Sequence, residues 1–161
     1  MLCVGDKAID FELESTKGRN FILSDRVKEG PVLLYFYPVD FGKTCTDYIE
    51  MMNERADDLE GMGVTMVHIN EGSMESHLSW TERTESRFEH LCDTDECIAK
   101  KYDAIIRQAR KESMIGRVNR CFFLVDRDMT LRYVWYAEWP MDTVPMDDLL
   151  ENVKEGLNGR L

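Results

Sequence analysis

The sequence predicts an α/β protein in which a mixed β-sheet carries helices on both faces. The segment Val32–Tyr37 is apolar or aromatic without alternation, which is typical of a strand buried on both faces. From Cys45 to Leu59, apolar residues recur at the spacing of one helix face, and a second apolar strand follows at Val64–Ile69. The apolar segment Arg120–Asp126 then leads into an alternating one, so parallel and antiparallel connections are both expected.

The N-terminal part predicts a β-hairpin, because Asp10–Leu13 and Asn20–Leu23 flank the turn-forming Lys17-Gly18. Ser24-Asp25 is expected to cap one helical turn, which Gly30-Pro31 ends.

The middle of the chain is more polar. Glu75–Arg87 predicts a surface helix with Leu78 and Trp80 as its apolar anchors. His90–Cys92 predicts a short strand, and Asp95–Tyr102 a further helix.

The C-terminal part begins with the basic segment Asp103–Val118, which predicts a loop with a possible helical turn. A turn at Asp126–Met129 should join Arg120–Asp126 to a returning strand, and Met146–Leu157 predicts a closing helix. Because no repeat or linker interrupts the chain, we expect residues 1–161 to form a single domain.

Size and charge narrow the possible partners. A chain of 161 residues can bury about 70% of its unfolded surface. Its net charge of −11 argues against nucleic acids and anionic membranes as partners. No segment reaches membrane-spanning length, and Met1–Val4 is too short for a signal peptide. An odd number of widely spaced cysteines suits a reducing cytoplasm: Cys3, Cys45, Cys92, Cys97 and Cys121.

Cys45 is the residue whose position suggests chemistry. It stands in the first turn of the expected helix, at the carboxyl end of a central strand, with Thr44 as the expected N-cap and Asp47 as its capping-box partner. Free backbone N–H groups and the helix dipole favour a thiolate there, and a thiolate suits peroxide or disulfide chemistry. The alternative is a small buried apolar residue without reactivity.

Five segments together resemble the peroxiredoxins, the thiol-specific antioxidant and alkyl hydroperoxide reductase superfamily. They span almost the whole chain, and the similarity is greatest to the bacterioferritin-comigratory, or Q-type, branch. The segments are Asp10–Leu13, Leu23–Asp25, Leu34–Phe41, Cys45-Thr46 and Arg120–Asp126. The resemblance implies a thioredoxin-like fold and an enzyme that reduces hydrogen peroxide or alkyl hydroperoxides.

The resemblance also implies roles for individual residues. Pro38 and Cys45 match the ends of the family motif Pro-x-x-x-Thr-x-x-Cys. Cys45 would attack the peroxide and become a sulfenic acid, and Pro38 would shield it. Arg120 matches the arginine that stabilises the thiolate and polarises the peroxide, which agrees with the expected effect of a guanidinium beside a helix N-terminus.

The chain departs from the family pattern at three positions. Gly42 replaces the motif threonine, which removes a hydroxyl and a hydrogen bond worth about 1.5–3 kcal/mol. Tyr48 replaces the usual glutamate, and Met129 replaces a turn glycine. Thr44 or Thr46 could supply the missing hydroxyl.

A resolving thiol is less clearly marked. The Q-type branch often has a second cysteine five residues after the first, where this chain has Glu50. Cys92 and Cys97 are possible substitutes, whereas Cys121 is expected in the core and Cys3 at the terminus. A one-cysteine cycle with an external thiol stays open.

No cofactor or metal is expected, since His68, His77 and His90 share no ligand spacing. Expected partners are a peroxide and a thioredoxin-like or small-thiol reductant, with the protein as a monomer or homodimer. A second hypothesis is a redox-sensing or binding module with little peroxidase activity, because of Gly42 and Tyr48. A dithiol oxidoreductase is disfavoured because no Cys-x-x-Cys is present.

Overall fold

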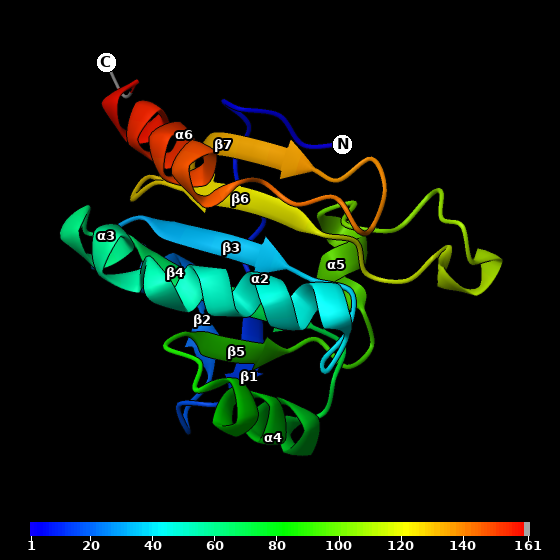
Figure 1. Cartoon of the computed structure of the whole chain (residues 1–161). Helices are drawn as coiled ribbons and strands as arrows, with labels where there is room; N and C mark the ends of the chain where they lie inside the picture. The colour runs from blue at the N-terminus through cyan, green and yellow to red at the C-terminus, as the bar shows by residue number, and fades with distance from the viewer. Residues whose placement is uncertain (160–161) are drawn as a thin grey trace.

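The computed structural model describes residues 1–159. Within them, seven strands form one mixed sheet (Figure 1). Across the sheet the strands lie in the order β2 (Phe21–Ile22), β1 (Glu12–Ser15), β5 (Glu89–Cys92), β4 (Thr65–Asn70), β3 (Val32–Phe36), β6 (Cys121–Val125) and β7 (Leu131–Tyr136). The N-terminal hairpin, the buried strands and the mixed sheet are therefore confirmed.

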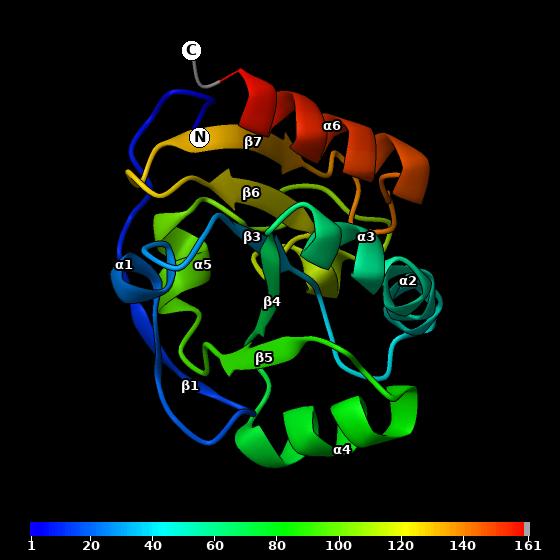
Figure 2. The ribbon, with the colours of Figure 1, turned by 90° about the vertical axis from the view of Figure 1, so that its left-hand side faces the viewer.

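Helices cover both faces of this sheet. Figure 2 shows α1 and α5 on the opposite side of the sheet from α2 and α3. The helices are α1 (Leu23–Arg26), α2 (Lys43–Glu54), α3 (Ala56–Gly61), α4 (Met74–Thr84), α5 (Cys97–Lys101) and α6 (Met146–Asn158), with a 3₁₀ turn at Glu112–Met114. The helical turn expected within the basic segment is thus present.

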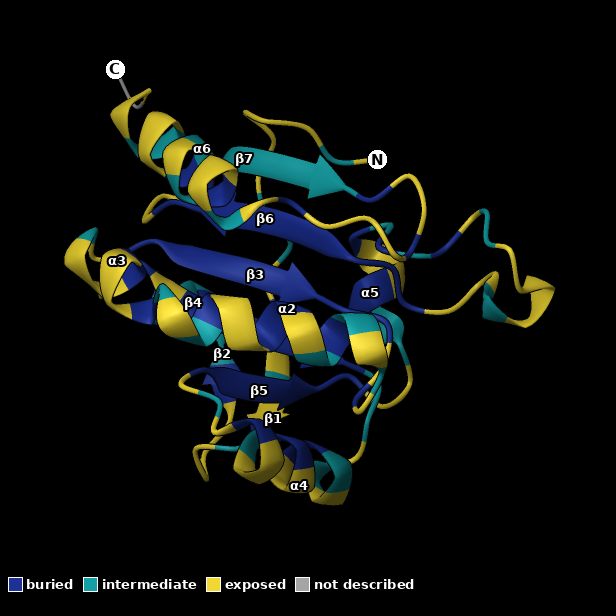
Figure 3. Cartoon of the chain, in the orientation of Figure 1, coloured by how far each residue is buried: buried dark blue, intermediate teal, exposed yellow. Residues whose placement is uncertain are grey.

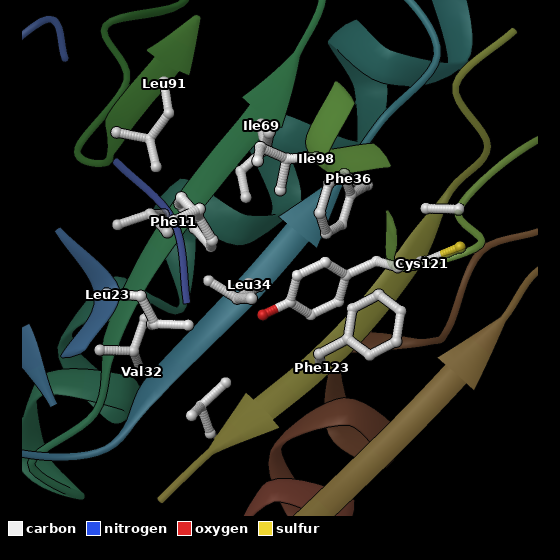
Figure 4. Close-up of a cluster of buried hydrophobic side chains, with 14 of the residues drawn as sticks. Phe11, Leu23, Val32, Leu34, Phe36, Ile69, Leu91, Ile98, Cys121 and Phe123 are labelled. Atoms are coloured by element: carbon white, nitrogen blue, oxygen red, sulfur yellow. The ribbon is translucent and has the colours of Figure 1, made fainter. Parts of the chain in front are cut away.

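Each face of the sheet has its own apolar core. One core contains Leu34, Phe36, Cys121 and Phe123 and lies under α1 and α5 (Figure 4). The other lies under α2, α3, α4 and α6. Strands β3 and β6 are buried throughout and β4 is buried except at Thr65, whereas α2 alternates buried and exposed residues along its length (Figure 3). Each face of the continuous apolar strands therefore meets a different set of helices, which explains their lack of alternation.

Strand β3 organises the sheet and positions the residues discussed below. It pairs in parallel with β4 and antiparallel with β6, and Phe36 lies opposite Cys121. Because β3 and β6 are antiparallel, Tyr37, which follows β3, and Arg120, which precedes β6, lie at the same end of these two strands. The loop that leads into α2 begins at that end of β3.

Some local predictions are wrong. Ile22, not Ser24, is the N-cap of α1, and no side chain caps that helix. The helix from Cys45 to Leu59 divides at Arg55, because the Arg55 N–H bonds the Met52 carbonyl three residues back instead of four.

In α4, Trp80 is buried as expected, but Leu78 is 47% exposed and does not anchor the helix. The buried residues of α4 are instead His77, Trp80 and Thr84, at the i, i+3, i+7 spacing of one face. Among residues 1–159, no helix has both the length and the apolar character needed to cross a membrane.

Candidate active site

Cys45 lies in the first turn of α2, and its side chain is buried, with 5% of its surface exposed. The N-cap of this helix is Gly42, so the expectation of Thr44 as the cap is wrong. No side chain caps the helix, because glycine has no acceptor to offer, and Thr46 Oγ1 donates to the Gly42 carbonyl at 2.7 Å. The N–H groups of the first turn are therefore available to a negative charge near Cys45.

Arg120 brings a buried positive charge to this cysteine. Its side chain is 1% exposed, and Nη2 lies 3.6 Å from Cys45 Sγ, within hydrogen-bond range for sulfur. The same Nη2 donates to the Pro140 carbonyl at 3.3 Å, while Nη1 donates to the Tyr35 hydroxyl. Two residues that lie 75 positions apart in the chain thus meet at one end of the central strands β3 and β6.

No carboxylate forms an ion pair with Arg120 in the described part of the chain. Tyr48, which stands where the family has glutamate, instead presents its ring to the guanidinium, with 5.7 Å between Cζ and the ring centroid. The Tyr48 hydroxyl donates to the Val144 carbonyl at 2.6 Å. Arg120 Nε is buried without a hydrogen-bond partner. The guanidinium is therefore held by neutral groups and the sulfur.

The tyrosines beside Arg120 carry no charge, so the Cys45 sulfur is the neighbour that can balance the charge of the guanidinium. Burial raises the pKa of both Tyr35 and Tyr48 far above neutral pH, so both phenols stay uncharged. Burial by itself lowers the pKa of Arg120, but the proximity of Tyr35 and Cys45 outweighs this effect and the pKa is raised. An unpaired buried charge is costly, and a Cys45 thiolate would offset that cost.

The loop between β3 and α2 is fixed through its backbone. Asn70 Nδ2 donates to the carbonyls of Tyr37 and Pro38, at 2.8 and 3.0 Å. Pro38 is buried, as its expected shielding role requires. Phe41 has a left-handed φ of 65°, and its ring packs edge-on against Trp80 at 5.2 Å. The contact with Trp80 helps to hold a backbone conformation that a non-glycine residue rarely adopts.

A buried ion pair joins the same loop to α4. Asp40 Oδ2 lies 2.7 Å from His77 Nδ1 and accepts from Ser76 Oγ at 2.6 Å, and Tyr37 donates to Oδ1 at 2.5 Å. Burial alone would raise the pKa of Asp40, but these hydrogen bonds lower it. His77 Nε2 faces the Leu91 carbonyl at 3.1 Å, which requires a proton on that nitrogen. Both ring nitrogens of His77 therefore have polar partners, Asp40 on one side and the Leu91 carbonyl on the other.

His68 and His90 complete a cluster of buried histidines, and their ring centroids lie 4.6 Å apart. Burial lowers the pKa of His68 to about 3 and also lowers the pKa of His90 well below its usual value. His90 Nε2 contacts Ser86 Oγ at 2.9 Å, whereas His68 Nε2 has no hydrogen-bond partner. Both rings are therefore neutral in the folded protein at neutral pH.

The Asp40–His77 pair was not predicted from the sequence. The helical spacing of His77 with Trp80 and Thr84 could have indicated it, because that spacing places His77 on the buried face of α4. The contribution of Tyr35 was also missed. Its position in an unbroken apolar strand gives no sign that its hydroxyl reaches Arg120.

The other candidate residues are dispersed. Thr44 Oγ1 donates to the Met141 sulfur at 3.2 Å and Thr46 Oγ1 to the Gly42 carbonyl, so both hydroxyls have other acceptors in this structure. All five cysteines are free. Burial raises the pKa of Cys92 to about 11, which disfavours its nucleophilic thiolate, whereas Cys97 is partly exposed.

Comparison with known proteins identifies the relatives of this chain. The sequence profile of the AhpC/TSA family matches residues 4–134. A Coxiella burnetii protein that carries the name peroxiredoxin bcp is 29% identical over 132 residues, which cover 82% of this chain and 87% of that protein. The chain spans about half the length of the chloroplast 2-Cys peroxiredoxins of Spinacia oleracea and Arabidopsis thaliana, which it also matches.

Solved structures share the fold. The peroxidoxin BcpB of Mycobacterium tuberculosis superposes with a TM-score of 0.79 at 23% identity, over 98% of each chain. A mutant of PrxQ from Xylella fastidiosa superposes with a TM-score of 0.82 at 21% identity, over 96% of each chain.

Proposed function

Because the chain belongs to the AhpC/TSA family of peroxiredoxins, we propose that it is a thiol-dependent peroxidase that reduces hydrogen peroxide or alkyl hydroperoxides through Cys45. The observation that carries the assignment of residues is the contact between Cys45 and Arg120. A guanidinium that is 1% exposed and has no carboxylate partner within residues 1–159 lies 3.6 Å from Sγ. This positive charge would stabilise the neighbouring sulfur as a thiolate.

The reaction step follows from this geometry. The Cys45 thiolate attacks one peroxide oxygen, so an S–O bond forms as the O–O bond breaks, and the sulfur loses two electrons to become a sulfenic acid. The other oxygen leaves as hydroxide or alkoxide and takes a proton from solvent. Arg120 stabilises the thiolate before the attack and the negative charge on the departing oxygen during it. Pro38 shields the sulfur from bulk water.

The sulfenic acid must then be reduced by thiols. A first thiol forms a mixed disulfide and releases water, and a second thiol restores Cys45. The first thiol could be Cys97 or an external molecule, either a thioredoxin-like protein or a small thiol. Free cysteines suit a cytoplasmic protein, and we propose that it works there as a monomer or homodimer.

Stopped-flow mixing tests the assignment. Micromolar hydrogen peroxide should oxidise the protein within a second, with a sulfenic acid on Cys45 that dimedone captures and mass spectrometry locates. Cys45→Ser should form no adduct, whereas Cys121→Ser, which changes a buried core thiol, should react like the wild type. No adduct on Cys45 after minutes would contradict the proposal and favour a sensing or binding module.

A further inference from the structure

Tyr37 is a buried phenol that the peroxidase step does not use. The residue is 1% exposed, and its hydroxyl donates to Asp40 Oδ1 at 2.5 Å. His90 Nδ1 lies 3.4 Å from the same phenol oxygen. The phenol proton therefore has a carboxylate within the distance of proton transfer, with an imidazole beside it.

Asp40 is the group that can accept this proton. Burial by itself would raise the pKa of Asp40, but its hydrogen bonds lower the pKa, so the carboxylate is ionised at neutral pH. Burial lowers the pKa of His90 well below its usual value, so the neutral imidazole adds no positive charge beside the phenol. His90 Nε2 contacts Ser86 Oγ at 2.9 Å, and Ser86 is partly exposed. The hydrogen-bond network thus extends from Tyr37 toward the surface.

The other tyrosines lack such a base. Tyr48, Tyr102 and Tyr136 donate to backbone carbonyls, which cannot take up a proton at neutral pH. In the part of the chain that the structure describes, Tyr37 is the tyrosine whose hydroxyl donates to an ionisable side chain. A proton can therefore leave this phenol without leaving its hydrogen bond.

The ring of Tyr37 is stacked on a tyrosine that lies beside the reactive sulfur. The ring centroids of Tyr35 and Tyr37 are 5.7 Å apart, with 20° between the planes. The Tyr35 hydroxyl accepts from Arg120, whose Nη2 is 3.6 Å from Cys45 Sγ. Cys45 and both tyrosines belong to the same buried apolar core. Stacked aromatic rings thus lead from the surroundings of the sulfur to Tyr37.

The two stacked rings differ in how readily they can lose an electron. Removal of one electron from a phenol leaves a radical cation, and an isolated charge is costly in a buried site. At Tyr35 this charge would face the guanidinium of Arg120, and like charges repel strongly at low dielectric. At Tyr37 the proton can pass to Asp40, which leaves a neutral radical and a neutral carboxylic acid. An electron deficit in this core should therefore come to rest on Tyr37.

We propose that Tyr37 is a one-electron redox site, which returns an electron to Cys45 when a radical oxidant has converted the thiolate into a thiyl radical. The inference rests on the Cys45 thiolate of the proposed function and adds a one-electron activity to it. The oxidant is a one-electron acceptor such as the carbonate radical, which becomes carbonate. Tyr37 gives one electron to the sulfur and its proton to Asp40, so that the thiolate is restored and a tyrosyl radical remains. A small reductant such as ascorbate then supplies one electron to the radical, and the proton returns from Asp40.

Pulse radiolysis in oxygen-free azide solution tests the redox site. Azide radicals remove one electron from exposed side chains, and the deficit should then move to a long-lived tyrosyl radical, which is followed by its absorption. Tyr37→Phe should lose this long-lived signal. Tyr136→Phe is the matched control, since it removes a partly exposed phenol that donates to a carbonyl, and it should keep the signal. A signal that persists in Tyr37→Phe would overturn the proposal.

A second measurement retains the phenol and its hydrogen bond. Fluorotyrosine in place of Tyr37 should add a fluorine splitting to the electron paramagnetic resonance spectrum of the trapped radical. Formation of the radical should be slower in heavy water than in water, because the proton moves to Asp40 with the electron. A spectrum without the fluorine splitting would place the radical elsewhere and overturn the proposal, and equal rates in the two solvents would overturn the role of Asp40.

The effect on the sulfur is measured after graded doses of azide radicals, with mass spectrometry of Cys45. Tyr37→Phe should lose the Cys45 thiol at lower doses than the wild type and Tyr136→Phe. Equal losses in the three proteins would overturn the return of an electron to Cys45. A tyrosyl radical on Tyr37 in a protein that reduced no peroxide would support the redox site and refute the proposed function alone.

Discussion

Two buried charged groups near the start of α2, Asp40 and Arg120, differ in their partners. The carboxylate of Asp40 has three side-chain partners, Tyr37, Ser76 and His77. By contrast, the guanidinium of Arg120 has no carboxylate partner among residues 1–159 and keeps one donor, Nε, without an acceptor. Both groups are almost completely buried, with 8% and 1% of their surfaces exposed.

The difference separates a structural pair from a reactive one. The charge of Asp40 is compensated by its neighbours, so it is used to join the loop between β3 and α2 to α4. The charge of Arg120 has no carboxylate partner among residues 1–159 and faces the Cys45 sulfur, so it is available for chemistry. Removal of a charge should therefore mainly affect stability at the first site and mainly affect rate at the second.

The largest effect is expected for His77→Leu. This substitution leaves the Asp40 carboxylate buried without its counter-ion, which should lower the free energy of unfolding by about 3–5 kcal/mol. Urea denaturation would measure the change. Ser76→Ala, which removes one hydrogen bond from the same carboxylate, is the matched control and should cost only about 1 kcal/mol. Equal losses in the two variants would show that the ion pair has no special weight.

Arg120→Met should instead lower the reaction rate and leave the stability of the fold largely unchanged. Methionine keeps much of the side-chain volume, and replacing a buried charge that has no carboxylate partner among residues 1–159 by an apolar group is often neutral or stabilising, so the free energy of unfolding should be unchanged or higher. The second-order rate constant with hydrogen peroxide should fall by about 10²–10³-fold, since a charged donor to the reacting atoms is lost. Stopped-flow kinetics and urea denaturation together make the test. A variant that unfolds easily while its folded fraction reacts normally would reverse the roles of the two sites.

Part of this arrangement could be predicted from the sequence. The apolar strands, the helix behind Cys45 and the distant arginine follow from local patterns and a family motif, and the register that sets Phe36 opposite Cys121 explains why Arg120 arrives at the sulfur. The spacing of His77 with Trp80 and Thr84 could have placed His77 on the buried face of α4, but its partner Asp40 could not be deduced, because that contact depends on how α4 packs beside the loop. Likewise, the break at Arg55 follows from a change of hydrogen-bond spacing that amphipathic periodicity does not record.

A smaller effect should appear as a pH dependence of stability that originates at His68, in the cluster of buried histidines. The folded pKa of His68, about 3, lies below the unfolded value of about 6.5, so the neutral ring stabilises the fold above pH 6.5. That contribution is lost as the pH falls from about 6.5 toward 3, at about 1.4 kcal/mol per pH unit. His68→Phe should reduce the slope of unfolding free energy against pH by that amount and keep the stacking on Phe88. An unchanged slope would indicate that His68 is already protonated in the folded state.

The smallest effect concerns the residue that begins α2. A threonine at position 42 would restore the family's hydroxyl near Cys45, but a Cβ there would meet Val39 Cγ1 at 2.9 Å. Because Val39 is 41% exposed, its side chain can move, and Val39→Ala removes the conflict. Gly42→Thr in the Val39→Ala background should therefore raise the rate constant with hydrogen peroxide by about tenfold, the value of one hydrogen bond to a charged group. Val39→Ala alone is the control and should react like the wild type. If the double variant gains nothing, the first-turn N–H groups and Arg120 already satisfy the peroxide, and the glycine costs this chain no rate.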